Sequence, residues 1–312
     1  MTQLSDLSPE QREVVDTWGK GLAVLAGAGS GKTTTLVMKC LELLKRKPEA
    51  RLVAVSFTER SASDIREKLS ARLQGNLEGH WVMTIHGLCG TILREYPREA
   101  GMDGDEKVLT QPEANMLWES AIQALWFDEL TPEIEAALHR LLARESRDSL
   151  LSLLVRVRDL QSFGVVESLL APEDPDNAAL GLLGRFVFER YDRLKKRRGA
   201  IDFNDLERGA DRALENLEVQ KAFHQRFDLV LVDEFQDTNP LQARILWRFA
   251  KPDLSNLCVV GDPKQSIYRF RDADVTVFED CCAQLSVRIN LSWNFRSRPE
   301  IIEFANQVCG PL

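Results

Sequence analysis

The sequence predicts an α/β fold with a parallel sheet. Six short, apolar and often β-branched runs are typical of strands that are buried on both faces, at residues 21–26, 52–57, 81–85, 228–232, 257–260 and 287–291. Helical patterns follow most of these runs, at residues 32–46, 62–73, 87–95, 241–249 and 299–308. This alternation of strand and helix favours a doubly wound sheet over a sandwich or a bundle.

The pattern changes between about residues 101 and 199. Helical periodicity dominates there, with closely spaced leucines at 138–142 and 150–154, and no strand run stands out. We therefore expect an inserted all-helical subdomain at residues 101–198. The α/β domain is then discontinuous and comprises residues 1–100 and 199–312.

Composition narrows the class of protein. Of the 312 residues 44% are hydrophobic, and the net charge of -8 excludes a surface coated in positive charge, although a local basic groove is still compatible with nucleic acid. The six cysteines form no CxxC pair, which argues against a zinc site. No apolar run has the roughly 20 residues of a membrane span, and residues 1–9 lack a signal-peptide pattern. We expect a cytoplasmic protein without membrane contact.

The most specific local pattern is Ala26-Gly-Ala-Gly-Ser-Gly-Lys-Thr33, between a strand and a helix. Its glycines let backbone N–H groups turn toward a phosphate, and the helix N-terminus adds partial positive charge. Lys32 is expected to reach the β and γ phosphates of a nucleotide, and the Thr33 hydroxyl to ligate Mg²⁺. A plain glycine-rich turn is the alternative. The predicted nucleotide-binding residues of this loop are Ala28, Gly29, Ser30, Gly31, Lys32, Thr33 and Thr34.

Two adjacent carboxylates end the predicted strand at 228–232. Asp233 is expected to hold Mg²⁺, and Glu234 to polarise the attacking water as general base. Neighbouring acids suit this chemistry because holding the metal and activating water are separate tasks. An acidic loop after a strand is the alternative.

Seven blocks in the same order resemble the motifs of one family. Besides the phosphate loop and the acidic motif, they lie at residues 7–12, 56–62, 84–89, 259–271 and 291–298. Together they resemble the UvrD/Rep/PcrA/RecB/AddA helicases of superfamily 1. The resemblance implies a RecA-like P-loop NTPase domain, the N-terminal motor of an ATP-hydrolysing DNA helicase or translocase with ATP and Mg²⁺ as cofactors. A nucleotide switch without turnover and another kind of P-loop enzyme are the alternative classes.

The resemblance also implies roles in nucleotide chemistry outside the phosphate loop. Gln11 and Arg12 correspond to the adenine-reading motif, and Phe295 to an aromatic that stacks on adenine. Gln265 corresponds to a γ-phosphate sensor, and Arg296 to an arginine finger. Each has an alternative: a helix-capping box for Gln11, core packing for Phe295, a polar loop for Gln265 and a surface salt bridge for Arg296.

The same resemblance implies DNA contacts. Relatives stack bases on aromatics of the block at 259–271, and other blocks position phosphates without reading sequence. Core packing is the alternative for the aromatic residues, and a structural role is the alternative for the histidine. The predicted DNA-binding residues are Phe57, Thr58, Thr84, His86, Tyr268, Phe270 and Arg271.

Two further segments each allow two interpretations. Residues 202–206 resemble a short family block, and they also read as a helix start with acidic caps. The basic run at 195–198 is either a solvated helix face or a contact to duplex phosphates.

The residues at 84–89, 262–271 and 294–297 resemble those of the RecB/AddA branch, whose members are subunits of helicase–nuclease complexes. The partners implied are single-stranded DNA, a duplex junction and subunits of such a complex. The family's second motor domain, with its last two motifs, is expected to be absent from these 312 residues, so that the chain binds nucleotide but does not unwind DNA alone.

Overall fold

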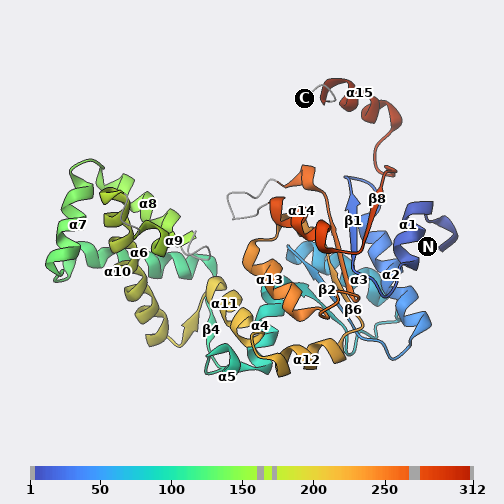
Figure 1. Cartoon of the computed structure of the whole chain (residues 1–312), viewed down its shortest axis with the longest axis horizontal. Coiled ribbons are helices and arrows are strands. Elements are labelled where there is room, and N and C mark those ends of the chain that lie inside the picture. Colours follow the sequence, from blue (N-terminus) through green and yellow to red (C-terminus); the bar gives the residue numbers. More distant parts are fainter. Residues whose placement is uncertain (1–3, 160–164, 171–173, 267–274, 310–312) are drawn as a thin grey trace. The chain divides into compact units, whose positions relative to one another are not determined.

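The computed structural model describes residues 4–159, 165–170, 174–266 and 275–309. The chain divides into two compact units, Met1–Glu99 with Ala210–Leu312, and Ala100–Gly209. Both are drawn in Figure 1. The structure shows two units. That the first is a motor domain and the second an inserted subdomain stays a prediction.

The first unit is built on a six-stranded parallel sheet, ordered β3-β2-β6-β7-β1-β8. All six predicted strands are confirmed. Their side chains form one continuous apolar core with α2, and β2, β6 and β7 are buried at nearly every position. The bounds are β1 Leu22–Ala26, β2 Leu52–Ser56, β3 Trp81–Thr84, β6 Leu229–Val232, β7 Leu257–Gly261 and β8 Val287–Leu291.

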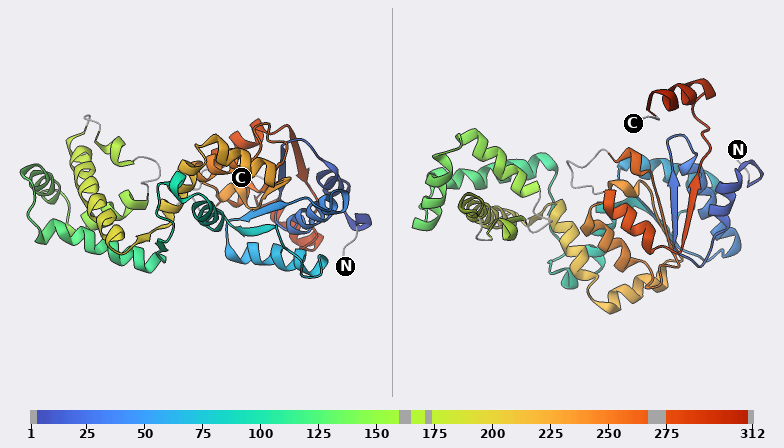
Figure 2. Two further views of the ribbon diagram at one scale, coloured as in Figure 1. Left: turned by 90° about the horizontal axis from the view of Figure 1, so that it is seen from below. Right: turned by 45° about the horizontal axis from the view of Figure 1, so that its top comes forward.

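Helices lie on both faces of this sheet (Figure 2), as expected for a doubly wound fold. Several begin with a side-chain cap: Ser8 caps α1 through a capping box, and Thr58 and Thr84 cap α3 and α4. The helices are α1 Pro9–Asp16, α2 Lys32–Arg46, α3 Glu59–Arg72, α4 Ile85–Glu95, α5 Pro97–Ala100, α12 Leu217–Arg226, α13 Pro240–Phe249, α14 Val275–Gln284 and α15 Pro299–Cys309, with 3-10 turns η1 Leu4–Asp6, η3 Phe235–Asp237 and η4 Pro263–Gln265.

The second unit is a helical bundle organised around one long helix, α10 (Pro175–Arg197), which packs on the other helices. Its apolar core includes Trp118, Leu150, Leu183 and Val187. The remaining helices are α6 Gln111–Phe127, α7 Pro132–Leu142, α8 Arg147–Asp159, α9 Val165–Leu169 and α11 Phe203–Ala213.

The prediction of no strand between residues 101 and 199 is wrong in one detail. Strand β4 (Lys107–Val108) pairs in parallel with β5 (Ala200–Ile201). Each strand has two residues, too few to produce an alternating pattern in the sequence. The unit is therefore helical with one short strand pair at its two ends.

Cys40, Cys89, Cys258, Cys281 and Cys282 are free and buried. Burial raises the pKa of the Cys40 thiol to about 12 and that of Cys258 to about 11, so neither is a reactive thiolate at neutral pH. Across the residues that the structure describes, no helix is long and apolar enough to cross a bilayer.

Candidate active site

Apart from Gln11 and Arg12 in α1, the predicted site residues of the first unit follow the carboxyl ends of parallel strands, and these ends lie at one edge of the sheet (Figure 1). The register aligns them: Ser56 is opposite Thr84, and Ala26 is opposite Leu291. Strands β6, β7, β1 and β8 are consecutive in the sheet and lead into the predicted nucleotide residues. The next two, β2 and β3, lead into the predicted DNA residues. This edge is where open α/β sheets bind ligands.

The phosphate loop turns from β1 into α2 through two glycines in left-handed backbone, Gly29 and Gly31, both with φ of 79°. A Cβ built at Gly31 would lie 2.6 Å from Gln11 Nε2, and one at Gly29 would lie 2.8 Å from the Cβ of Arg296. Neither position has room for a side chain, so both need glycine for conformation and for space.

The N-terminus of α2 is open to an anion. Gly31 is its N-cap and supplies no side-chain acceptor for the first N–H groups. Thr33 and Thr34 stand half-buried in this first turn. The Ser30 hydroxyl is buried without a hydrogen-bond partner among the described residues. Unsatisfied N–H groups and the helix dipole favour a negative group here, which fits a phosphate.

A polar network joins the loops after β1, β6 and β7. Lys32 Nζ lies 2.8 Å from Glu234 Oε2, across 202 positions of sequence. The Gln236 amide donates to the same oxygen at 2.9 Å and accepts from the Asp262 N–H at 2.9 Å. Gln265 Nε2 then donates to Asp262 Oδ2 at 2.6 Å. Three predicted catalytic residues are thus brought together through two residues that bridge them.

Asp233 and Glu234 have unusual environments. Asp233 is 5% exposed, its Oδ1 has no partner among the described residues, and burial together with the nearby Glu234 carboxylate raises its pKa to about 6. Glu234 is a non-glycine residue in left-handed backbone, with φ of 54°. Such strain and unsatisfied charge are concentrated at functional sites.

This donor set suits Mg²⁺ bound together with phosphates. Among the described residues no group of three or more His, Cys, Asp or Glu could cage a metal. A phosphate-bound Mg²⁺ needs only one or two protein oxygens and keeps several waters. The buried, unpaired oxygen of Asp233 and the Thr33 hydroxyl in the first turn of α2 would supply them.

Gln11 has the helix-capping role that was its alternative, and its role in reading adenine stays a prediction. It completes the capping box of α1 with Ser8, whose N–H donates to Gln11 Oε1 at 3.0 Å, and its Nε2 donates to Ser30 O at 3.0 Å. A side-chain amide has two N–H donors and two oxygen lone pairs. One N–H and one oxygen lone pair of Gln11 are left over, which is compatible with the predicted contact to adenine. Arg12 is exposed and donates to Leu4 O at 3.1 Å.

The loop after β8 is fastened to the phosphate loop. The Phe295 N–H donates to Gly29 O at 2.8 Å, and Asn294 Nδ2 donates to Ala28 O at 2.8 Å. The Asn294 oxygen in turn accepts from the backbone N–H of Arg296 at 2.9 Å. The Phe295 side chain is exposed, so the core-packing alternative does not describe it in this structure. Arg296 is also exposed.

The predicted DNA residues of β2 and β3 differ in access. Thr58 is exposed, and its hydroxyl caps α3. Thr84 is 6% exposed, caps α4 and donates to Glu59 Oε1 at 3.1 Å. Phe57 and His86 are half-buried. The remaining predicted DNA residues, Tyr268, Phe270 and Arg271, lie outside the described residues.

Sequence reasoning gave no role to Asp262 and Asn294, which position the groups around them. Asp262 accepts from the backbone N–H of Lys264, and Asn294 from two successive N–H groups, as Asp and Asn do in turns. The signal was available, since both residues lie within three positions of the end of a predicted strand.

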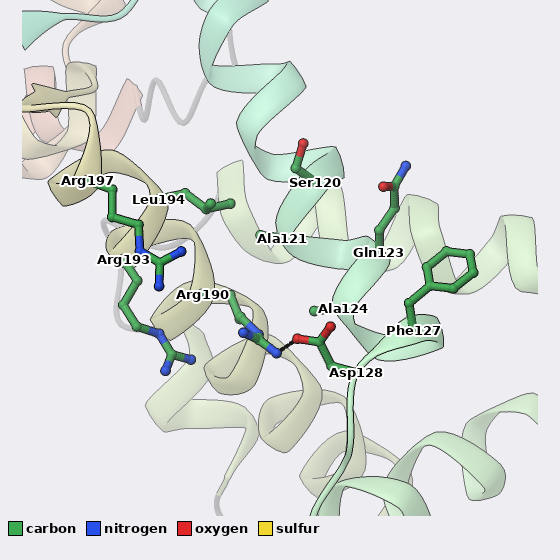
Figure 3. Close-up of a pocket in the computed structure, with 10 residues that line it drawn as sticks. All are labelled: Ser120, Ala121, Gln123, Ala124, Phe127, Asp128, Arg190, Arg193, Leu194 and Arg197. Atoms are coloured by element: carbon green, nitrogen blue, oxygen red, sulfur yellow. Dashed lines mark ion pairs between the residues drawn. The ribbon is translucent and has the colours of Figure 1, made fainter.

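A cavity of about 270 Å³ in the second unit contains no predicted site residue (Figure 3). It lies between α6 and α10, and Arg190, which pairs with Asp128, lines it together with Arg193 and Arg197. The basic run beside it is only partly solvated, because Lys195 is buried while the next three side chains are exposed.

Comparison with known proteins gives a consistent result. The profile described as the UvrD/REP helicase N-terminal domain matches residues 7–285. The chain is 29% identical to the ATP-dependent DNA helicase PcrA of Bacillus subtilis (strain 168), over 98% of the chain and 39% of the relative. It is 30% identical to DNA helicase II of Salmonella typhimurium and 29% identical to DNA helicase II of Escherichia coli, each over 97% of the chain and 40% of the relative. The chain thus spans about two fifths of these relatives.

Proposed function

We propose that this chain, which belongs to the UvrD/REP helicase N-terminal domain family, is the ATP- and Mg²⁺-binding motor domain of a DNA helicase. The observation that carries the proposal is the pairing of Lys32 with Glu234 at the open end of α2, beside the unpaired buried oxygen of Asp233. A phosphate-binding loop, a metal ligand and a base thus converge at one point.

The residues divide the work. Lys32 contacts the β and γ phosphates and exchanges its partner Glu234 for phosphate oxygens when nucleotide binds. Glu234 is then available to take a proton from the attacking water, and Gln236 keeps its carboxylate in place. When bound, Mg²⁺ supplies positive charge that offsets the charge of the phosphates. Gln265 and Arg296 face the same phosphates from the loops after β7 and β8.

Equilibrium binding of a fluorescent ATP analogue with Mg²⁺ tests this proposal. The Lys32→Ala variant is expected to lose at least about tenfold in affinity, because a charge-assisted contact to phosphate contributes roughly 1.5–3 kcal/mol. Lys45→Ala, a change of an exposed lysine on the same helix, is the matched control and should bind like the unmodified chain. Equal affinity of the Lys32→Ala variant would contradict the proposal.

Single-stranded DNA is the proposed second ligand, at the loops after β2 and β3. The exposed position of Thr58 and the half-buried Phe57 and His86 at the same sheet edge support it. Contacts of this kind hold the sugar-phosphate backbone and are weakened by salt. We expect oligo(dT) to bind, other single strands of the same length to bind equally well, and the affinity to decrease as the salt concentration rises.

The UvrD/PcrA type is the branch that the relatives support. The finer assignment to RecB/AddA, with helicase–nuclease subunits as partners and a role in recombination, rests on the spelling of three blocks alone. Co-purification of a nuclease subunit with the full-length protein from its own cells would favour that assignment. Full helicase activity of the purified full-length protein without any partner would favour the UvrD/PcrA type.

A further inference from the structure

Two large aromatic side chains stand exposed on the loop after β8. Trp293 and Phe295 are each 56% exposed, and their rings are nearly parallel, with centroids 6.2 Å apart and an interplanar angle of 19°. The family resemblance gives a role to Phe295 only. Two large aromatic rings that lie side by side and exposed form an apolar patch, and such a patch can mark a binding site.

The position of these rings is fixed by the loop that carries them. Ser292 Oγ donates to Glu10 Oε1 at 2.7 Å, and the Phe295 N–H donates to Gly29 O at 2.8 Å. The Asn294 side chain ties the residue between the two rings to Ala28 O at 2.8 Å. The loop is therefore anchored on both sides of Trp293, to α1 and to the phosphate loop.

The rings border the phosphate loop at a defined place. A ring carbon of Phe295 lies 3.7 Å from a Cβ built at Gly31, and Gln11 Nε2 lies 2.6 Å from the same point. The aromatic surface and the amide of Gln11 thus meet next to the end of the loop that binds phosphate. Trp293 extends that surface outward from Phe295. A ligand that contacts both the aromatic surface and the phosphate loop has a flat apolar face and a phosphate tail.

We propose that Trp293 is a second stacking residue for the nucleobase of the bound nucleotide, alongside Phe295; this inference rests on the proposed function. Stacking is tolerant of base identity because every base has a π-face, whereas hydrogen bonds to the base edge are selective. Trp293 therefore adds affinity for all nucleoside triphosphates, and the amide of Gln11 supplies the preference for adenine.

The test compares ATP with tripolyphosphate, which has the phosphates but no base. Both are titrated with Mg²⁺ into the unmodified chain and into Trp293→Ala and Trp293→Phe by calorimetry. Trp293→Ala is expected to weaken ATP about tenfold, the effect of losing one stacked base, and to leave tripolyphosphate unchanged. Trp293→Phe keeps a ring and retains most of the ATP affinity. ATP is also expected to alter tryptophan emission in the unmodified chain more than in Trp293→Phe.

Three results would contradict the role of Trp293 without contradicting the proposed function. These are unchanged ATP affinity in Trp293→Ala, equal weakening of ATP and tripolyphosphate, or weakened oligo(dT) binding with unchanged ATP binding. The last would assign the ring to a DNA base. In each case ATP binding that depends on Lys32 leaves the proposed function standing. Binding of neither ligand by the unmodified chain would overturn the proposed function and the role of Trp293 together.

Discussion

Two pairs of carboxylates, one in each unit, have opposite surroundings. In the second unit, Asp202 and Asp205 accept from each other's backbone N–H at 2.9 and 3.0 Å, and both pair with Lys195. Tyr191 adds a fourth partner by donating to Asp202 at 2.9 Å. This pair is complete within the protein.

The pair in the first unit is incomplete. Glu234 has Lys32 and Gln236 as partners, but Asp233 Oδ1 is buried without one among the described residues. A buried polar atom without a partner destabilises a fold, so it is retained where a ligand satisfies it. The comparison shows two uses of paired carboxylates. The pair whose oxygens have partners stabilises the helical unit, and the pair with an oxygen left without a partner lies at the candidate active site.

The largest expected effect is on the complete pair. Lys195→Met leaves the buried Asp202 and the half-buried Asp205 without their cation, which destabilises the chain by about 3–5 kcal/mol. Urea denaturation followed by far-UV circular dichroism measures the loss. Lys196→Met is the control, because its side chain is exposed on the same helix and its removal should change stability little. A loss below about 1 kcal/mol in Lys195→Met, in the range of a surface ion pair, would contradict the account of this pair.

Removing a charge from the incomplete pair is expected to stabilise the chain instead. Folding raises the pKa of Asp233 from 3.8 to about 6, so at pH 7 the charged folded form is disfavoured. Asp233→Asn removes that charge and is expected to raise the free energy of unfolding by about 1–3 kcal/mol. Asp202→Asn, in the complete pair, should lower it. Destabilisation by both variants in the same urea assay would break the comparison.

The smallest effect concerns an exposed acid of the second unit. Glu113 accepts from Lys107 Nζ at 2.5 Å and from the Thr110 N–H at 2.8 Å, and these bonds lower its pKa from 4.5 to about 2. A lowered carboxyl pKa stabilises the fold above pH 4.5, and this contribution is lost as the pH falls toward 2. Melting temperatures between pH 6 and pH 3 should therefore fall less in Glu113→Gln than in Glu119→Gln, a change at an exposed position of the same helix. Equal falls would show that the bonds of Glu113 to Lys107 and Thr110 contribute nothing to stability.

The parallel sheet was predictable because its strands are buried on both faces and therefore read as continuous apolar runs. The phosphate loop was equally visible, since Gly29 and Gly31 occupy positions that only glycine fits. The bridging role of Gln236 and Asp262 was less visible, because it depends on β6 and β7 being neighbours in the sheet. The two bonded residues, Gln236 and Asp262, are 26 positions apart in the sequence. Residues 202–206 do form a helix start with acidic caps, and the pairing of these acids with Lys195 could not be predicted from the sequence. Their resemblance to a short family block stays a prediction.

The Mg²⁺ dependence of ATP affinity in Asp233→Asn tests the central claim most directly. The unmodified chain and Asp202→Asn are expected to bind ATP at least about tenfold more tightly with Mg²⁺ than with EDTA, since a metal ligand typically contributes that much. Asp233→Asn should bind ATP with the same low affinity under both conditions. If the variant keeps the full Mg²⁺ dependence, then the unpaired oxygen of Asp233 does not hold the metal, and the account of the incomplete pair is wrong.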